Sequence, residues 1–293
     1  MNSNTQTPRL ALLLLLVCCG ACSSETAGDA GNAADALLAD ATTEAAPGGV
    51  CPTAPGPKMV WVPWPAGKGG GYCIDSTEVT QAQYAAFVAA NVDPSTQSAK
   101  CAWNTAFAPD PECMQHLLGT PSPNLPQTCV DWCDSDAFCR WAGKRLCGGS
   151  GDKENDFNTS EWYNACSAGG TRLRPYGDDL KPYCNVRVSN GGQLVLLDVG
   201  SNPSCEGGSP GILNMLGNAL EWTAECMAIS GGESCWARGS NFRGNWPNEI
   251  DTKNPLDNPL CAEERKLTVP VFSGTHASLD GSVGFRCCAN EVR

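Results

Sequence analysis

The chain has 293 residues, which is enough to bury the core of one large domain or of two small ones. Its formal net charge of -12 at pH 7 and its sequence pI of about 4.6 argue against nucleic-acid binding, because DNA and RNA phosphates require a basic protein surface. Nucleic acid is therefore excluded as an expected partner.

The N-terminus is typical of an exported protein. Arg9 precedes the apolar run Leu10–Val17, which is too short to cross a bilayer but suits the core of a signal peptide. The run leads into Cys-Gly-Ala-Cys at residues 19–22, a pattern that resembles a lipobox. We therefore expect a signal peptide at residues 1–21 and a lipid anchor on Cys22, which would hold the protein in the cell envelope, in the outer membrane if the cell is Gram-negative. Cleavage of a plain signal peptide at the same place is the alternative.

Residues 22–50 have the composition of a disordered tether. The segment is rich in Ala, Asp, Glu, Gly and Thr, and from Ser23 to Gly49 it contains no aromatic residue, no lysine and no arginine. Such a composition cannot bury enough apolar surface to fold. We expect it to hold one folded domain, residues 51–293, away from the membrane.

The cysteines indicate an oxidising compartment. Of the nineteen in the chain, three lie in the leader and the other sixteen are spread from Cys51 to Cys288. An even number over a whole exported domain is typical of a disulfide framework. Zinc is the weaker alternative, because the only histidines are His116 and His276, and no Cys-x-x-Cys pair lies outside the leader. Two pairs are close enough in sequence to be first candidates for disulfides: Cys101 with Cys113, and Cys226 with Cys235.

The folded part is expected to begin with two short strands and a helix. Met59–Pro63 and Tyr72–Asp75 have the apolar composition of strands and are separated by a glycine-rich turn. Thr77 is placed to cap a helix in which apolar side chains at residues 80–88 recur at helical spacing. Residues 92–127 are rich in Pro, Asn and Ser and predict a long surface loop.

A second helix is predicted within Cys129–Cys147. Asp134 or Ser135 can cap its start, and Gly143 can end it.

The stretch Gly211–Glu225 concentrates polar and glycine residues in an otherwise apolar sequence, a pattern that neither an amphipathic helix nor a strand would choose. The side chains of Asn214 and Glu221 are hard oxygen donors, and so are the carbonyl groups of Gly217 and Ala219. A tight backbone curl could turn these oxygens toward one calcium ion. The alternative is a glycine-containing turn followed by a strand or helix whose tryptophan lies in the core.

Six motifs occur along the folded part of the chain. They are Y-C-I-D-S-T-E-V-T at 72–80, W-C-D-S-D-A-F-C-R-W-A-G-K-R-L at 132–146, R-P-Y-G-D at 174–178, N-M-L-G-N-A-L-E-W at 214–222, R-G-S-N-F-R at 238–243 and V-G-F-R-C at 283–287. In this order they resemble the motifs of the formylglycine-generating enzyme family, also called sulfatase-modifying factor domains. The resemblance spans residues 59–289 and implies one domain. It implies a mixed α/β (α+β) fold with little regular secondary structure, rich in disulfides and related to the C-type lectin fold.

The resemblance also implies site residues. In the family the N-x-x-G-N-x-x-E-W segment binds a structural calcium ion, whose ligands fall here on Asn214, Gly217, Ala219 and Glu221. Two family disulfides carry over, pairing Cys139 with Cys287 and Cys166 with Cys261. A second calcium site, to which Asn185 would correspond, is left open, because its acidic partner is not found shortly downstream.

The oxidase of this family converts a sulfatase cysteine to formylglycine with oxygen and one copper ion, held by two cysteine thiolates five residues apart. Here Gly244 and Glu249 stand at the two matching positions, so copper is not expected. A scaffold that keeps the family's other motifs beside an emptied copper position therefore predicts a binding module for an extended peptide, a glycan or an envelope protein. The resemblance places its groove where the family holds its extended substrate peptide, and the candidate groove residues are Arg238, Asn241, Phe242, Arg243 and Trp246.

Two alternatives stay open from sequence. An oxidase acting on an exported protein such as a sulfatase could persist if Cys235, Cys261 or Cys288 supplied thiolates from displaced positions. A purely structural module that assembles with other envelope proteins would need neither copper nor a small ligand.

Overall fold

The computed structural model describes residues 48–117, 120–148, 156–178, 184–186, 195–229, 232–243, 260–262, 264–269 and 281–292. Its helices are α1 (Gln81–Ala89), α2 (Pro111–Gln115), α3 (Trp132–Trp141) and α4 (Glu161–Ser167), with short 3-10 turns η1 (Pro94–Thr96), η2 (Ala99–Cys101) and η3 (Pro203–Cys205). Its strands are β1 (Met59–Pro63), β2 (Gly71–Asp75), β3 (Arg145–Leu146), β4 (Glu206–Gly207), β5 (Ser209–Leu213), β6 (Leu220–Ile229), β7 (Gly232–Arg238), β8 (Glu264–Val269), β9 (Val283–Phe285) and β10 (Cys287–Asn290). None of these helices is both long and apolar enough to cross a membrane.

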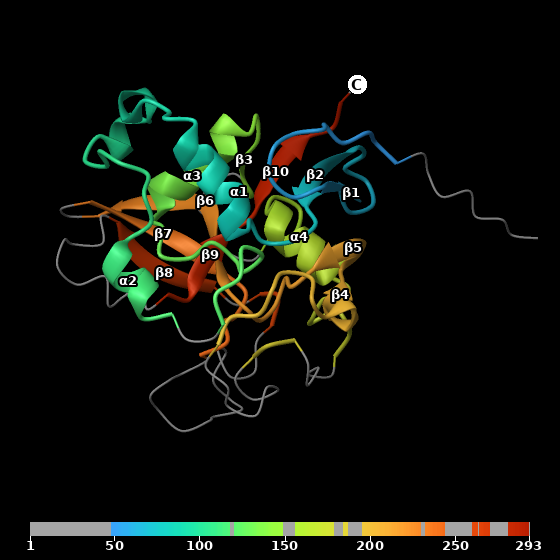
Figure 1. Ribbon diagram of the computed structural model, residues 1–293. Helices are drawn as coiled ribbons and strands as arrows, with labels where there is room; N and C mark the ends of the chain where they lie inside the picture. The colour runs from blue at the N-terminus through green and yellow to red at the C-terminus, as the bar shows by residue number, and fades with distance from the viewer. Residues whose placement is uncertain are drawn as a thin grey trace, which may run out of the picture. The chain divides into compact units, whose positions relative to one another are not determined.

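The strands form two four-stranded sheets and one two-stranded ribbon. The first sheet has the order β1-β2-β10-β3 and is antiparallel throughout. The second has the order β8-β7-β6-β9, in which β6 and β9 run parallel. β4 and β5 form the ribbon. Only Arg286 separates β9 from β10, so this C-terminal segment passes directly from one large sheet to the other (Figure 1).

The helix after β2 begins later than the sequence predicted. Thr80, not Thr77, is the N-cap of α1: its hydroxyl accepts the backbone N–H of Gln83 at 3.2 Å. The Gln83 side chain in turn accepts the Thr80 N–H at 2.9 Å. This capping box satisfies two N–H groups that the start of a helix leaves unpaired. The later start keeps Glu78 and Val79 in extended chain, where the Val79 N–H donates to the carbonyl oxygen of Phe285 at 3.0 Å.

The second predicted helix, α3, also has a different cap. Asp131, rather than Asp134 or Ser135, is the N-cap, because the Asp131 and Asp134 carboxylates each accept the other residue's N–H, at 2.9 and 3.1 Å. The predicted end at Gly143 is confirmed: this glycine has φ of 70° directly after the C-cap, a conformation that glycine adopts without strain.

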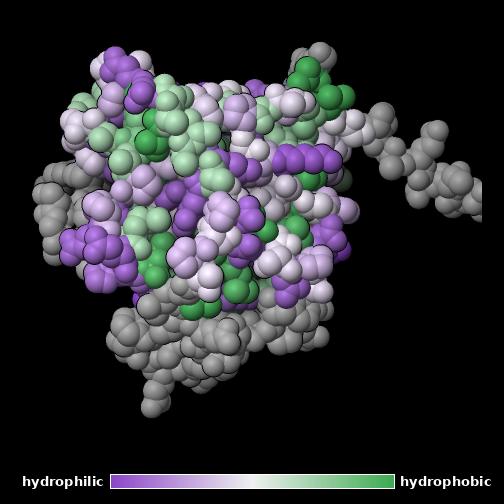
Figure 2. Space-filling view, in the orientation of Figure 1, coloured by the Kyte–Doolittle hydropathy of each residue, from purple (hydrophilic) through white to green (hydrophobic). Residues whose placement is uncertain are grey.

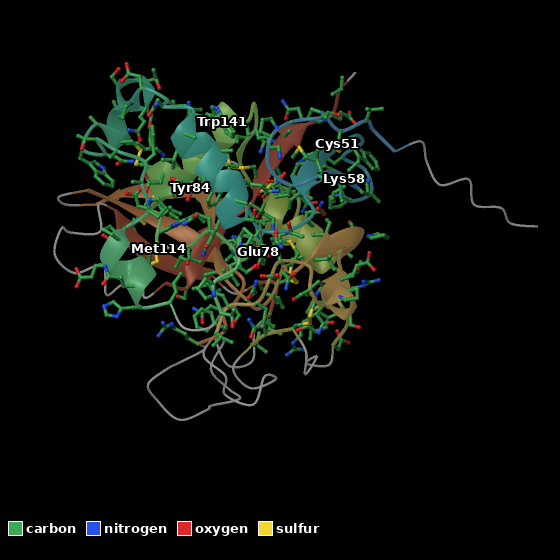
Figure 3. The ribbon with its side chains drawn as sticks, viewed as in Figure 1. Cys51, Lys58, Glu78, Tyr84, Met114 and Trp141 are labelled. Atoms are coloured by element: carbon green, nitrogen blue, oxygen red, sulfur yellow. A yellow bond between two sulfur atoms is a disulfide. The ribbon has the colours of Figure 1, made fainter. Side chains whose placement is uncertain are left out.

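An aromatic core lies between the helices and the second sheet, with α1 and α3 side by side (Figure 1). The ring of Phe138 lies 5.7 Å from that of Tyr84 and 5.4 Å from that of Phe285, centroid to centroid. The Tyr84 hydroxyl (Figure 3) donates to the carbonyl oxygen of Phe107 at 2.8 Å. Phe107 is itself 7% exposed. The predicted surface loop at residues 92–127 therefore contributes to the core instead of lying wholly on the surface.

The surface mixes polar and apolar residues. Hydrophilic and hydrophobic side chains are interspersed over the coloured part of the face in Figure 2. Single exposed apolar residues are normal on a protein surface and do not mark an interface by themselves. The large ones among the described residues are Val50, Trp103, Leu173, Leu197, Met227 and Val292.

Candidate functional site

The backbone curl expected between β5 and β6 is present. Asn214, Gly217 and Asn218 have φ of 58°, 91° and 64°, in the left-handed region that glycine and asparagine tolerate best. A Cβ atom on Gly217 would overlap the carbonyl oxygen of Cys184, so this position accepts only glycine. The strand that follows, β6, places Trp222 in the core with 0% exposure.

Asparagine side chains hold the curl against neighbouring segments. Asn214 Oδ1 accepts the backbone N–H of Gly200 at 3.0 Å. Asn218 Oδ1 accepts the side-chain amide of Asn185 at 2.8 Å and the backbone N–H of Leu197 at 3.0 Å. These bonds connect the curl to residues 185 and 197–200, which lie near it only because of the fold.

The Glu221 carboxylate is engaged by two buried donors. Arg286 donates to it twice, from Nε at 2.7 Å and from Nη2 at 2.6 Å, and both side chains have 0% exposure. Trp162 Nε1 donates to the same carboxylate at 2.7 Å. The guanidinium also donates to the carbonyl oxygens of Asp75, at 3.1 Å, and Leu213, at 2.9 Å. Arg286 thus links β2, the end of β5 and β6 from its place between β9 and β10.

A second buried carboxylate, Glu78, interacts electrostatically with both members of this pair. Figure 3 labels its position in the fold. Its Oε1 accepts the side-chain amide of Asn218 at 3.0 Å. Its Oε2 is buried and has no hydrogen-bond donor among the described residues. Burial raises the pKa of Glu78 to about 8, with the Arg286 charge opposing the rise and the Glu221 charge adding to it. Glu78 is therefore a carboxyl group that the fold favours in its neutral form.

The sequence analysis did not predict the buried partners of Glu221 or the burial of Glu78. It also missed a buried ion pair between Lys144 and Asp75. Lys144 Nζ donates to Asp75 Oδ1 at 2.6 Å, and the Cys287 N–H donates to Asp75 Oδ2 at 2.9 Å. Burial raises the pKa of Asp75 to about 6 even though the Lys144 charge lowers it. The signal was present in the sequence: Lys144 and Arg286 each stand in a largely apolar motif, where a charged side chain requires a buried partner.

The oxygen donors of the curl have capacity left for a hard cation. Each oxygen of a carboxylate or amide has two lone pairs, so Glu221 retains one acceptor position on Oε1, and Asn214 retains one beside its bond to Gly200. No donor in the described part of the chain bonds the carbonyl oxygens of Gly217 and Ala219. The donor set fits calcium chemistry. Because Arg286 already neutralises Glu221, we expect a weaker site than one with several free carboxylates.

All sixteen cysteines from Cys51 to Cys288 are paired. The two pairs implied by the resemblance are present, and so is the candidate pair Cys226–Cys235. The candidate pair Cys101–Cys113 is wrong, because residues 92–127 fold back onto the start of α3 instead of closing a loop of their own. The eight disulfides are Cys51–Cys73, Cys101–Cys133, Cys113–Cys129, Cys139–Cys287, Cys147–Cys288, Cys166–Cys261, Cys184–Cys205 and Cys226–Cys235.

Four of the five candidate groove residues are buried: Arg238 at 2% exposure, Asn241 at 1%, Phe242 at 0% and Arg243 at 8%. The Phe242 ring packs in a small apolar cluster with Leu125, Leu196 and Ala219. The expectation that Phe242 lines an open groove is therefore wrong, because its ring is a core element. The Arg243 guanidinium carbon lies 5.1 Å from the centre of that ring. Trp246, Gly244, Glu249 and the lipidation candidate Cys22 lie outside the described residues.

A pocket of about 300 Å³ lies between residues 103–111 and the start of α3. Three aspartates line it, and each has a structural task. Asp110 caps α2 by accepting the Cys113 N–H at 2.6 Å, while Asp131 and Asp134 form the capping box of α3. Burial and the Asp131 charge raise the pKa of Asp134 well above its usual value. The helix starts account for these carboxylates, so we assign them no catalytic role.

Comparison with known proteins agrees with the motifs. The family model for the sulfatase-modifying factor enzyme 1-like domain matches residues 62–290. Bovine (Bos taurus) "Formylglycine-generating enzyme" is 27% identical over 185 residues, covering 58% of this chain and 45% of the relative. The mouse (Mus musculus) "Inactive C-alpha-formylglycine-generating enzyme 2" is 24% identical over 180 residues, covering 58% of this chain and 50% of the relative. The chain thus spans half or less of the length of these two relatives.

Solved structures support the fold. The structure of PvdO from Pseudomonas aeruginosa matches with a TM-score of 0.50 and 18% identity, over 82% of this chain and 95% of that one. At this identity the likeness concerns the fold alone, and it confirms the predicted mixed α/β architecture. Because the family model covers most of the domain, from the last residues of β1 to the end of β10, the chain belongs to the sulfatase-modifying factor enzyme 1-like family, that of the formylglycine-generating enzymes.

Proposed function

We propose that this protein is a family member that has lost copper chemistry and works by binding an extended peptide or a glycan in the cell envelope. The observation that carries the proposal is the state of its cysteines. Gly244 and Glu249 stand where the family has its two copper thiolates, and the sixteen cysteines from Cys51 onward are consumed in disulfides.

The alternative is an oxidase with a displaced copper site. The three cysteines that could have supplied it, Cys235, Cys261 and Cys288, are bonded to Cys226, Cys166 and Cys147. Copper(I) is held by soft, deprotonated thiolates, and a sulfur in a disulfide cannot serve as one. Two disulfides would have to be reduced before such a site could form, which disfavours this alternative in an oxidising compartment.

Calcium has a structural role in the proposal. The side chains of Asn214 and Glu221 and the carbonyl groups of Gly217 and Ala219 would hold the ion, which would fix the curl between β5 and β6. The lone pairs still free on these groups support this assignment. The proposal also places the protein in the cell envelope, attached through a lipid on Cys22, on the strength of the N-terminal sequence.

The ligand contact expected on the family's substrate side is Trp246. Phe242 is fully buried, and its ring packs against the Arg243 guanidinium group instead of contacting a ligand. Large aromatic residues are over-represented among the contacts that dominate binding energy. We expect Trp246→Ala to weaken capture from peptide and glycan arrays at least tenfold, whereas the exposed control Trp103→Ala should leave capture unchanged. Equal capture by both variants would place the ligand elsewhere.

The loss of oxidase chemistry has its own test. The purified protein, supplied with copper(I) and oxygen, is incubated with a sulfatase-derived peptide that contains the target cysteine. We expect the peptide mass to show no formylglycine. Formylglycine formation above a copper-only control would contradict the proposal and favour the oxidase.

A further inference from the structure

A second concave site lies where three parts of the chain meet. Its walls come from the end of β1 and the residues after it, from the last turn of α4, and from the turn into β5. The volume is about 190 Å³, below the range of roughly 300–1,000 Å³ that holds drug-sized ligands. The site therefore suits a single ring rather than an extended chain. Its main contact residues are Pro63, Trp64, Pro65, Asn164, Gly169 and Ser209.

The central polar group of this site is Asn164, which is 1% exposed. Its Nδ2 donates to the carbonyl oxygen of Pro63 at 3.0 Å and to the hydroxyl of Tyr72 at 2.9 Å. The Tyr72 hydroxyl gives its own proton to the carbonyl oxygen of Glu161 at 2.5 Å. Both neighbours of Nδ2 are therefore acceptors, which fixes the orientation of the amide and identifies the opposite atom as Oδ1.

Asn164 Oδ1 has no donor among the described residues. A Cβ atom built on Gly169 would lie 3.7 Å from this oxygen and 3.7 Å from Pro65 Cγ, so Oδ1 is buried next to Gly169, within reach of the gap between Gly169 and Pro65. A buried acceptor without a partner is unfavourable, and a ligand that brings a hydroxyl or N–H group would satisfy it.

The rest of the lining indicates the class of ligand. None of the residues that line the site carries a formal charge, so a neutral ligand is favoured over an ionic one. Pro63, Trp64 and Pro65 supply an apolar wall. The Trp64 ring is fixed by Tyr72, at 4.7 Å between centroids, and by Lys68 Nζ, at 3.2 Å from its centroid. Ser209 adds a half-exposed hydroxyl that can donate and accept.

We propose that this pocket binds one neutral, hydroxylated sugar ring, with Asn164 Oδ1 accepting a ligand hydroxyl and Ser209 bonding a second one. The inference goes beyond the proposed function, since it involves neither the cysteines nor the residues from Arg238 to Trp246. One common kind of peptide site binds its ligand along the exposed edge of a strand. The proposed sugar ring would bind in this pocket without a strand edge.

The test is a titration of the ¹⁵N-labelled protein with glucose, galactose, mannose and N-acetylglucosamine, each also presented as an oligosaccharide. We expect the side-chain amide resonances of Asn164 to shift with at least one sugar. Ser209→Tyr should fill the pocket and weaken the binding of that sugar at least tenfold. The matched control Ser204→Tyr, at an exposed position outside the pocket, should leave the affinity unchanged.

The arms of the test separate the outcomes. Binding of the free sugar and the oligosaccharide with similar affinity means that one ring occupies the site, and tighter binding of the oligosaccharide means that neighbouring surface adds contacts. If no sugar shifts Asn164, or if Ser209→Tyr binds as tightly as the wild type, the proposal is wrong and the pocket holds only water. Trp246→Ala should keep the Asn164 shift, and Ser209→Tyr should keep any array capture that Trp246→Ala weakens, so the two proposals fail separately.

Discussion

Two glutamates at the centre of the fold show how the partners of a side chain decide its charge. Glu221 has Arg286 on both oxygens and Trp162 on one. Glu78, equally buried, has a neutral amide on one oxygen and no donor among the described residues on the other. The first therefore has a charged partner at bonding distance, whereas burial raises the pKa of the second to about 8.

The raised pKa of Glu78 predicts a pH-dependent stability. The folded state binds the proton more tightly than the unfolded state, so the contribution of this group is complete below the unfolded pKa of 4.5 and is lost as pH rises through about 8. Glu78→Gln stays neutral at every pH. Relative to wild type, we expect its free energy of unfolding to rise by up to about 1.4 kcal/mol per pH unit between roughly pH 5 and 8, measured by urea unfolding in EDTA.

A matched control is Glu112→Gln, at an exposed glutamate in the first turn of α2. Its difference from wild type should be flat across the same range. A Glu78→Gln curve parallel to that of wild type would show that Glu78 is charged throughout and that the account of this buried group is wrong.

The Glu221–Arg286 pair predicts a large loss of stability when only one member is changed. Glu221→Gln removes the charge that compensates a fully buried guanidinium, which should cost about 3–5 kcal/mol. The double variant Glu221→Gln with Arg286→Met should recover part of that loss, because no uncompensated charge remains. Urea unfolding of Glu221→Gln, Arg286→Met and the double variant measures the coupling energy between the two residues, and strictly additive losses of free energy would contradict it.

At the scale of elements, the curl between β5 and β6 illustrates what a sequence can tell. The run of asparagine and glycine predicts a curl because these residues tolerate the left-handed conformation, and three of them adopt it. The predicted N-caps of α1 and α3 are wrong. Thr77 and Asp134 have the right chemistry for a cap, but so do their neighbours Thr80 and Asp131, and only the structure shows which side chain accepts a free N–H. Local chemistry therefore limits the candidates for an N-cap to several residues but does not identify which of them is the cap.

The curl also supports the clearest test for calcium. Asn214→Gly removes the proposed side-chain ligand, while glycine accommodates φ of 58° without strain. Calcium should raise the melting temperature of the wild type, because a ligand of the folded state stabilises by mass action, and should raise that of the variant much less. Glu221→Gln is unsuitable for this purpose, since it also breaks the pair with Arg286. A calcium shift of the same size in Asn214→Gly would remove Asn214 from the site.

At the scale of the whole molecule, disulfides supply much of the stabilisation that longer helices and strands would otherwise give the fold. Cys287 and Cys288, adjacent on β10, bond Cys139 of α3 and Cys147 beside β3 across sequence separations of 148 and 141 residues. In the chain-entropy view each bond could contribute about 4–5 kcal/mol by restricting the unfolded chain. Motifs could suggest Cys139 with Cys287, but the other long pairing follows from the arrangement of β10 against β3, which spacing alone does not encode.

The central claim, that the family's copper chemistry has been lost, rests on the pairing of the cysteines, and a thiol count tests it most directly. The purified mature protein is denatured without reductant and titrated with a thiol reagent, while the native protein is analysed for copper. Lipidation would block the thiol of Cys22, and a chain expressed from Ser23 removes Cys22 together with the leader cysteines Cys18 and Cys19. The account predicts no free thiol and no bound copper in that chain. Two free thiols together with one copper ion per chain would contradict it and favour the oxidase.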